Sequence, residues 1–113
     1  MSDTRLALRI DGHQGISVLR LDGELDLATE QSFVRACTRL LAQGQVKIVL
    51  DVSRLAFCDC TGLGALIAEQ QQAERLGGYL RLIGVHGPLA RLLTLTELVD
   101  AFPTYVDLRQ ACG

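Results

Sequence analysis

Aromatic residues and proline are scarce in this sequence of 113 residues, which holds no Trp, two Tyr, three Phe and two Pro. Nearly half of the residues are nevertheless apolar, so the core has to be built from Leu, Val, Ile and Ala. A folded domain of this length buries roughly two-thirds of the surface that its unfolded chain exposes, and it needs no metal or disulfide for stability. The composition predicts one folded domain over residues 1–113 and excludes disorder.

A basic surface is also missing. Lys47 is the only lysine, the arginines are scattered, and the formal net charge is −2. A nucleic-acid-binding protein needs a basic stripe to neutralise phosphates, so no nucleic acid partner is predicted. No apolar run approaches the length of a membrane span, and the polar N-terminus holds no apolar signal segment. The sequence therefore predicts a cytoplasmic protein that does not insert into a membrane.

The cysteines, at positions 37, 58, 60 and 112, do not form the pattern of a disulfide framework or a metal site. The loop between Cys58 and Cys60 is too short for an easy bridge. A zinc site needs a second pair of ligands at a recognisable spacing, whereas His13 and His86 stand alone. No metal and no cofactor are predicted.

An enzyme would need more than the sequence offers. Cys60 would require a nearby base, and His86 is the candidate because both residues follow predicted strands. No motif supplies an oxyanion hole, and no Gly-rich loop of the Walker type is present. The sequence predicts a binding protein, not an enzyme.

Hydrophobic periodicity predicts an α/β fold in which helices alternate with strands, so that a mixed sheet is covered by helices. The first helical spacing begins near Ala28, and Cys37 falls on its apolar stripe. The predicted elements are a hairpin over residues 6–21 with its turn at Gly12–Gly15, a helix over 28–41, a strand over 46–52, a helix over 61–76 whose apolar face ends at Leu76, a strand over 79–85, a helix over 89–95, a strand over 102–106 and a final helix over 107–112.

The turn Asp59-Cys60-Thr61-Gly62 joins the central strand to the second long helix. Asp59 or Cys60 occupies the N-cap position, and the first N–H groups of the helix point out of the turn. Gly62 and Gly64 are expected to leave this end bare, so that a partner backbone can approach closely. The turn is therefore predicted to be a protein-binding surface, where an added phosphate would change binding sharply.

Two stretches together resemble one family. The first is Gly23-Glu24-Leu25-Asp26, and the second runs from Asp51-Val52-Ser53 through Phe57-Cys58-Asp59-Cys60-Thr61-Gly62-Leu63-Gly64 to Leu66. They are similar to G-E-L-D and D-L-S-x-L-x-F-x-D-S-[ST]-G-L-G-x-L of the STAS domain, which sulfate transporters and bacterial anti-sigma factor antagonists share. The resemblance runs essentially end to end, and the missing membrane segment favours the standalone antagonist branch.

The resemblance implies a mostly parallel sheet of four to five strands with an N-terminal β-hairpin and with helices mainly on one face. It also implies a partner, an anti-sigma factor that is a serine kinase of the histidine-kinase-like ATPase type. Capture of that partner frees a sigma factor, and phosphorylation of the first hydroxyl residue after the turn's aspartate abolishes binding. The implied partner-binding residues are Glu24, Asp26, Asp59, Cys60, Thr61, Gly62, Leu63 and Gly64.

Position 60 departs from the family pattern, because the phosphoacceptor position holds Cys60 and thiols are not substrates of ordinary serine kinases. Three interpretations follow. Cys60 keeps binding and removes regulation, Thr61 takes the phosphate instead, or Cys60 is a redox-sensitive thiol favoured by the helix N-terminus. The last interpretation would make the protein a redox sensor, and Asp59 acts against it by disfavouring the thiolate.

Other residues have simpler interpretations. Cys58 is predicted to be a core residue, Asp51 a strand-end acceptor for turn N–H groups, and Asp26 either the cap of the helix after Leu27 or part of the binding surface. A competing function is a STAS subunit of another assembly, such as a lipid-transport complex or a stress-signalling scaffold. A short last helix would also expose part of the sheet, which predicts a homodimer surface there.

Overall fold

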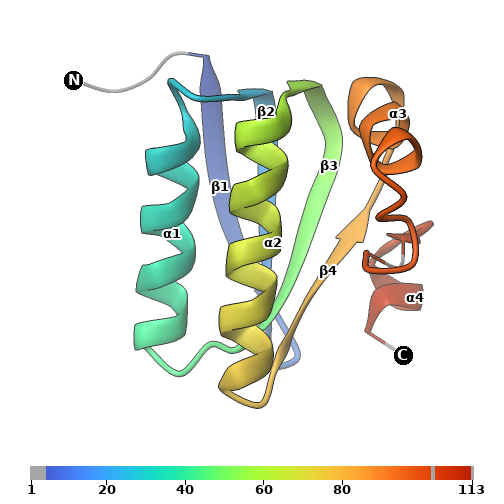
Figure 1. The fold of residues 1–113 in the computed structure, drawn as a ribbon. Helices are drawn as coiled ribbons and strands as arrows, with labels where there is room; N and C mark the ends of the chain where they lie inside the picture. Colours follow the sequence, from blue (N-terminus) through green and yellow to red (C-terminus); the bar gives the residue numbers. More distant parts are fainter. Residues whose placement is uncertain (1–4, 103, 113) are drawn as a thin grey trace.

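The computed structural model describes residues 5–102 and 104–112, and over these residues it shows an α/β fold of five strands and four helices (Figure 1). The predicted fold class is confirmed. In chain order the elements are β1 (Leu6–His13), β2 (Ile16–Leu25), α1 (Glu30–Ala42), β3 (Lys47–Cys58), α2 (Cys60–Arg75), β4 (Tyr79–Ile83), α3 (Gly87–Leu95), β5 (Thr104–Tyr105) and α4 (Leu108–Ala111).

The strands form one sheet in the order β1-β2-β3-β4-β5. β1 and β2 are antiparallel, and the other neighbouring pairs are parallel. Helices α1 and α2 lie side by side over one face of the sheet, whereas α3 and α4 lie toward its β4 end (Figure 1). Because β2, β3 and β4 are parallel, their carboxyl ends meet at one edge of the sheet. The turns after these strands therefore gather at that edge.

The hairpin turn is tighter than the sequence predicted. It consists of Gln14 and Gly15, whose φ angles of 51° and 81° are those of a two-residue turn with both central residues left-handed. Gly12 lies inside β1, where it pairs with Ser17. The alternation of apolar residues located the hairpin correctly, but the local backbone geometry decided which two residues turn.

β3 runs to Cys58, so the prediction of a strand ending at Val52 was wrong. The pairing of β3 with β2 shifts register at two places, where β3 carries an extra residue. Such bulges delay the next inward-facing residue, and Val52, Leu55 and Cys58 are therefore buried at intervals of three. Residues 53–58 thus lack the near-continuous apolar run on which the prediction of this strand relied. β2 likewise continues through Leu25.

The main core lies between the sheet and the helices α1, α2 and α3. Cys37 is fully buried there, as its helical spacing predicted. Leu76 was expected to continue the apolar face of α2, but it is 56% exposed because the helix ends one residue earlier. Helix residues in this core include Phe33 and Leu40 of α1, Leu63, Leu66 and Ala73 of α2, and Leu89 and Leu93 of α3.

A smaller apolar cluster lies on the other face of the sheet, beneath α4. Arg81 holds α4 in place, because Nη1 donates to the carbonyl of Ala111 at 2.6 Å and the guanidinium lies 3.8 Å from the centre of the Tyr79 ring. α4 therefore covers a part of the sheet that a short last helix was predicted to expose. The buried residues of this cluster are Ile16, Val49, Ile83 and Ala111.

The segment before α4 is mostly irregular. The predicted strand over 102–106 is limited to the two residues of β5, and Pro103 lies outside the described residues. Phe102 is fully buried in the main core, and Gln70 of α2 donates to the carbonyl of Ala101 at 2.9 Å. Within residues 5–102 and 104–112, no helix has both the length and the apolar character needed to cross a membrane.

Candidate functional site

The two stretches singled out in the sequence meet at the carboxyl edge of the sheet. Leu25, the last residue of β2, pairs with Cys58, the last residue of β3. The Asp59 N–H then donates to the Leu25 carbonyl at 3.2 Å. This contact fixes the start of α2 beside the end of β2, so Glu24 and Asp26 lie at the same edge as Asp59 and the first turn of α2.

Asp59 caps α2. Its backbone is extended, with φ −98° and ψ −176°, and its Oδ1 accepts a hydrogen bond from the Gly62 N–H at 2.8 Å. Its carbonyl accepts from the Leu63 N–H at 2.9 Å. The sequence left Asp59 and Cys60 as alternative caps, and the structure assigns the cap to Asp59. Cys60 is therefore the first residue of the helix, where backbone N–H groups have no partner within the helix.

The predicted partner-binding residues divide by exposure. Cys60 and Gly64 are exposed, and the carboxylate residues and Thr61 are half-buried. Gly62 and Leu63 are buried. The expectation that Gly62 leaves the helix end bare is wrong, because a Cβ at this position would lie 2.5 Å from the Leu25 carbonyl oxygen. Glycine is needed at Gly62 so that α2 can approach β2 closely. At Gly64 a Cβ would meet no heavy atom within 4 Å.

The loop between β2 and α1 is held by a network around Thr29. Asp26 Oδ1 accepts from the N–H groups of Ala28 and Thr29, at 3.0 and 3.1 Å. The fully buried Thr29 donates its hydroxyl to the Glu24 carbonyl at 2.8 Å and accepts from the Asp26 N–H at 2.9 Å. Asp26 therefore supports the turn before α1, but it is not the helix cap that one of its two interpretations predicted, because Thr29 is the N-cap residue of α1. Thr29 was missed, although an Asp three residues before a Thr is a known turn signal.

Two large apolar side chains are exposed at the same edge. Leu27, in the loop, is 72% exposed, and Phe57, which pairs with Glu24, is 44% exposed. The sequence did not predict their exposure, because an apolar residue next to a buried strand is usually buried itself. We refer to the exposed and half-buried residues here as the α2 edge: Glu24, Asp26, Leu27, Phe57, Asp59, Cys60, Thr61 and Gly64.

Only one of the cysteines near this edge is exposed. Cys58 is buried, as predicted, and burial together with the neighbouring Asp59 and Cys60 raises its pKa to about 12. Burial also raises the pKa of Cys37, with a smaller contribution from Glu69. Cys60 is exposed by comparison, and Cys112 is partly exposed. A reagent or a partner protein can therefore reach the thiol of Cys60 but not those of the buried pair.

A model of the STAS domain family matches residues 7–111. This chain belongs to the STAS family. It is 30% identical over 101 residues to the anti-sigma F factor antagonist of Paenibacillus polymyxa, with 88% of this chain and 86% of that protein covered. It is 28% identical over 105 residues to the anti-sigma-F factor antagonist RsfB of Mycobacterium tuberculosis, with 90% and 85% covered.

The fold agrees with this assignment. A crystal structure of an anti-sigma factor antagonist from Mycobacterium paratuberculosis superimposes with a TM-score of 0.83 and 27% sequence identity, over 99% of this chain and 96% of that one. The resemblance to STAS proteins of the standalone antagonist type is thereby confirmed, and so is the STAS fold with its N-terminal hairpin.

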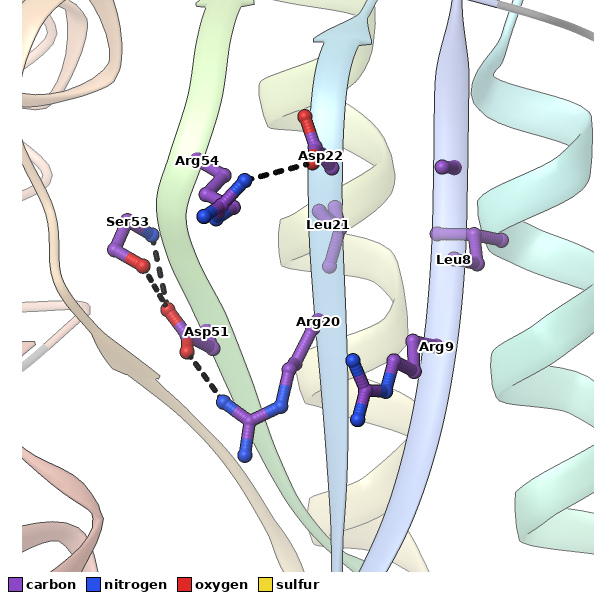
Figure 2. Close-up of a pocket in the computed structure, with 9 residues that line it drawn as sticks. Leu8, Arg9, Arg20, Leu21, Asp22, Asp51, Ser53 and Arg54 are labelled. Carbon is purple, nitrogen blue, oxygen red and sulfur yellow. Dashed lines mark hydrogen bonds and ion pairs between the residues drawn. The ribbon is translucent and has the colours of Figure 1, made fainter.

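A hollow of about 560 Å³ lies on the face of the STAS sheet that α1 and α2 leave open. Figure 2 shows its charged side chains on β1, β2 and β3, in front of the sheet. Arg20 connects the strands, because Nη1 donates to Asp51 Oδ2 at 2.8 Å and Nε donates to Asp11 Oδ2 at 3.2 Å. Arg54 lies 3.6 Å from Asp22. The charges in the hollow are thus already paired within the domain.

Asp51 is at the centre of this network, in the middle of β3 and not at the strand end that was predicted. Its Oδ1 accepts from the Ser53 N–H at 3.0 Å and from the Ser53 hydroxyl at 2.6 Å. Partial burial acts to raise the pKa of Asp51, but the hydrogen bonds from Ser53 and the Arg20 guanidinium outweigh it and hold the pKa below its ordinary value. The ionised carboxylate therefore stabilises the fold.

Asp51→Asn is expected to lower the free energy of unfolding by about 1–2 kcal/mol at pH 7, since hydrogen bonds to a charged group are lost. A lowered folded-state pKa gives stability that is present above the unfolded-state value, roughly pH 4, and is lost as the pH falls through the folded-state pKa. The free energies of unfolding of the native protein and Asp51→Asn should thus become equal in acid. Urea unfolding between pH 7 and 3 measures this. Asp22→Asn, which removes an exposed pair, is the control, and an equal loss in that variant would contradict the assignment.

Proposed function

We propose that this STAS protein binds an anti-sigma factor through the α2 edge and thereby releases a sigma factor. The relatives named above are anti-sigma factor antagonists and are matched over most of their length. The proposal assigns Glu24, Asp26 and residues 59–64 to the contact, with Gly62 and Leu63 acting from beneath the surface. Sigma factors act with RNA polymerase, so the proposed site of action is the bacterial cytoplasm.

One observation carries the proposal. Cys60 is exposed at the first position of a helix that is tied to β2 by the Asp59–Leu25 hydrogen bond and capped by Asp59. The surface around it is preorganised, and it combines outward N–H groups with the apolar side chains of Leu27 and Phe57. Rigid surfaces with central apolar anchors favour protein partners, because little conformational entropy is lost on binding.

The arrangement supports binding and not catalysis. Among the described residues, no group of three or more His, Cys, Asp and Glu side chains is placed to hold a metal ion. The hollow of about 560 Å³ lies on the open sheet face and is lined by residues other than those of the α2 edge. The proposed role of the α2 edge is therefore recognition.

The proposed partner is an anti-sigma factor of the serine-kinase type, whose target hydroxyl is replaced by Cys60. A sulfur in place of the oxygen keeps the size and exposure of the side chain, so the contact is retained. The thiol is not a substrate for transfer of a phosphate to serine or threonine, so the release signal is lost. Thr61 is half-buried and therefore less accessible to a kinase than position 60.

The function is tested by competition. Native protein added to a complex of the anti-sigma factor and its sigma factor, both from the same genome, is expected to release free sigma factor and to form a new complex with the anti-sigma factor. Size-exclusion chromatography or anisotropy of a labelled sigma factor measures the release. Absence of any complex with any anti-sigma factor of that genome would contradict the proposal.

The apolar part of the α2 edge has a matched pair of variants. Leu27→Ser should raise the concentration needed for half-maximal release about tenfold, because an exposed anchor at an interface is lost. Leu76→Ser removes an equally large exposed side chain at the far end of α2, about 24 Å along a helix of this length, and should have no effect. Equal effects of the two substitutions would place the contact elsewhere.

A further inference from the structure

The outer edge of β1 has no neighbouring strand among the residues that the structure describes. β1 is eight residues long and pairs with β2 in an unbroken register. The Glu24 N–H donates to the Arg5 carbonyl at 2.7 Å, so in this ladder the odd-numbered residues direct their backbone groups toward β2. The backbone groups of Leu8, Ile10 and Gly12 therefore point outward and are available to another strand.

The side chains of this edge carry opposite charges two residues apart. Arg9 and Asp11 lie on the open face of the sheet, and Figure 2 shows Arg9 on β1 beside Arg20. Between them Ile10, on the helix side, is 47% exposed although it is large and apolar. Edges that avoid pairing commonly carry charged side chains, proline or a bulge, and charges prevent pairing of two copies when like signs lie opposite each other. β1 contains neither proline nor a bulge, and its two edge charges have opposite signs.

We propose that β1 pairs with β1 of a second copy of this chain, antiparallel and about a two-fold axis at Ile10. In this register Ile10 lies opposite Ile10 of the second copy, and the outward backbone groups of both strands exchange hydrogen bonds. Arg9 then lies opposite Asp11 of the second copy, and Asp11 opposite its Arg9, in non-hydrogen-bonded pairs where side chains approach most closely. Two sheets of five strands join into one of ten.

The charges select this register. Moving the axis by one residue would place Arg9 opposite Arg9 or Asp11 opposite Asp11, and like charges directly opposite are destabilising. Moving it to Leu8 would leave Arg9 opposite Ala7. With the axis at Ile10, both charges of each strand find the opposite sign, as a self-complementary two-fold contact requires.

The contact is separate from the α2 edge. It uses residues 7–13, which pair with residues 16–22 of β2, whereas the α2 edge begins at Glu24. The inference does not depend on the proposed function, and a dimer of this kind would present two α2 edges. It also differs from the homodimer surface that a short last helix predicted, because α4 and β1 lie toward opposite ends of the sheet.

Charge exchange tests the pairing. Sedimentation velocity over a range of concentrations should show a reversible dimer of the native chain. Arg9→Asp or Asp11→Arg alone should raise the dimer dissociation constant at least about tenfold, since each converts two attractive pairs into repulsive ones. A mixture of the two variants should form a heterodimer with restored affinity. Arg91→Asp, an equal charge change on α3, should have no effect.

A single cysteine tests the register. Ile10→Cys, in a chain that also carries Cys60→Ser and Cys112→Ser, should form a disulfide dimer on mild oxidation, because directly opposed Cα atoms are roughly 5.5 Å apart. Leu8→Cys in the same chain should not, since the two thiols would be separated by four residues, about 13 Å along the strand. Three results would each overturn the proposal. They are a native chain that stays monomeric at its highest soluble concentration, mixed variants that fail to associate, and a disulfide that forms at position 8 and not at position 10. Thermal melting confirms that each variant is folded.

Discussion

Cys60→Asp is expected to weaken binding to the anti-sigma factor at least about a hundredfold, which corresponds to roughly 2.7 kcal/mol. The substitution places a carboxylate on an exposed side chain of the α2 edge, next to Asp59. A charge added at the centre of an interface loses its water on binding and repels any carboxylate of the partner. Isothermal titration calorimetry with the native and variant proteins measures the change.

Loss of folding would not explain this result. A carboxylate in the first turn of a helix interacts favourably with the helix dipole, so the melting temperature of Cys60→Asp should equal or exceed that of the native protein. Gln71→Asp adds the same charge to an exposed position of α2 three turns from its start, and it should bind normally. Native affinity in Cys60→Asp would remove position 60 from the contact.

The same position is expected to restore phosphorylation when it carries a hydroxyl. With the proposed kinase partner and ATP, the native protein should gain no phosphate, and Cys60→Ser should gain one phosphate per chain and lose its affinity. Intact-mass measurement reports both. Phosphorylation of the native protein but not of Thr61→Ala would show that Thr61 is the phosphorylated residue and that regulation is retained.

Gly23→Ala is expected to lower the free energy of unfolding by about 2–4 kcal/mol. Gly23 has φ +122°, and a Cβ there would lie 2.1 Å from the carbonyl oxygen of Arg5. Both the backbone conformation and the space therefore require glycine. Relief of the clash would push β1 away from β2 next to Glu24, whose N–H donates to that carbonyl.

Guanidinium unfolding of Gly23→Ala against Gly12→Ala measures the effect. Gly12 lies in the same hairpin, its φ is not in the left-handed region, and a Cβ there would meet nothing within 4 Å. Its substitution should change the free energy of unfolding by less than about 0.5 kcal/mol. Equal stability of the two variants would mean that the hairpin adapts to a side chain at Gly23, and that the glycine of the G-E-L-D stretch has another purpose.

Gly62 and Gly23, next to the site, differ in what the sequence indicated for them. Gly62 was expected to leave the helix end open to a partner, whereas Gly23 was noted only as part of the G-E-L-D stretch. In the fold the space beside each glycine is occupied by the protein itself, by the carbonyl of Arg5 at Gly23 and by that of Leu25 at Gly62. A glycine signals close approach, but only the tertiary structure shows which backbone approaches.

The sequence by itself determined the local features of this protein. The hairpin, the amphipathic α1 and the start of α2 at Asp59 or Cys60 follow from periodicity and capping, which depend on residues a few positions apart and therefore appear in one sequence. The burial of Cys37 follows from the same periodicity, whereas the burial of Cys58 was expected because the resembling family carries an apolar residue at this position. The resemblance to the STAS family also rested on contiguous residues, from Gly23 to Asp26 and, more specifically, from Asp51 to Leu66.

Only the tertiary structure decided which distant residues meet. The length of β3 depends on bulges opposite β2. The exposure of Leu27 and Phe57 depends on where α1 and α2 pack on the sheet. The ion pair of Asp51 depends on the neighbouring parallel strand, which carries Arg20. The free edge of β1 depends on the strand order. Each of these is set by the register between strands or by packing between layers. Such contacts join residues that are distant in the chain, so they produce no periodic pattern in the sequence.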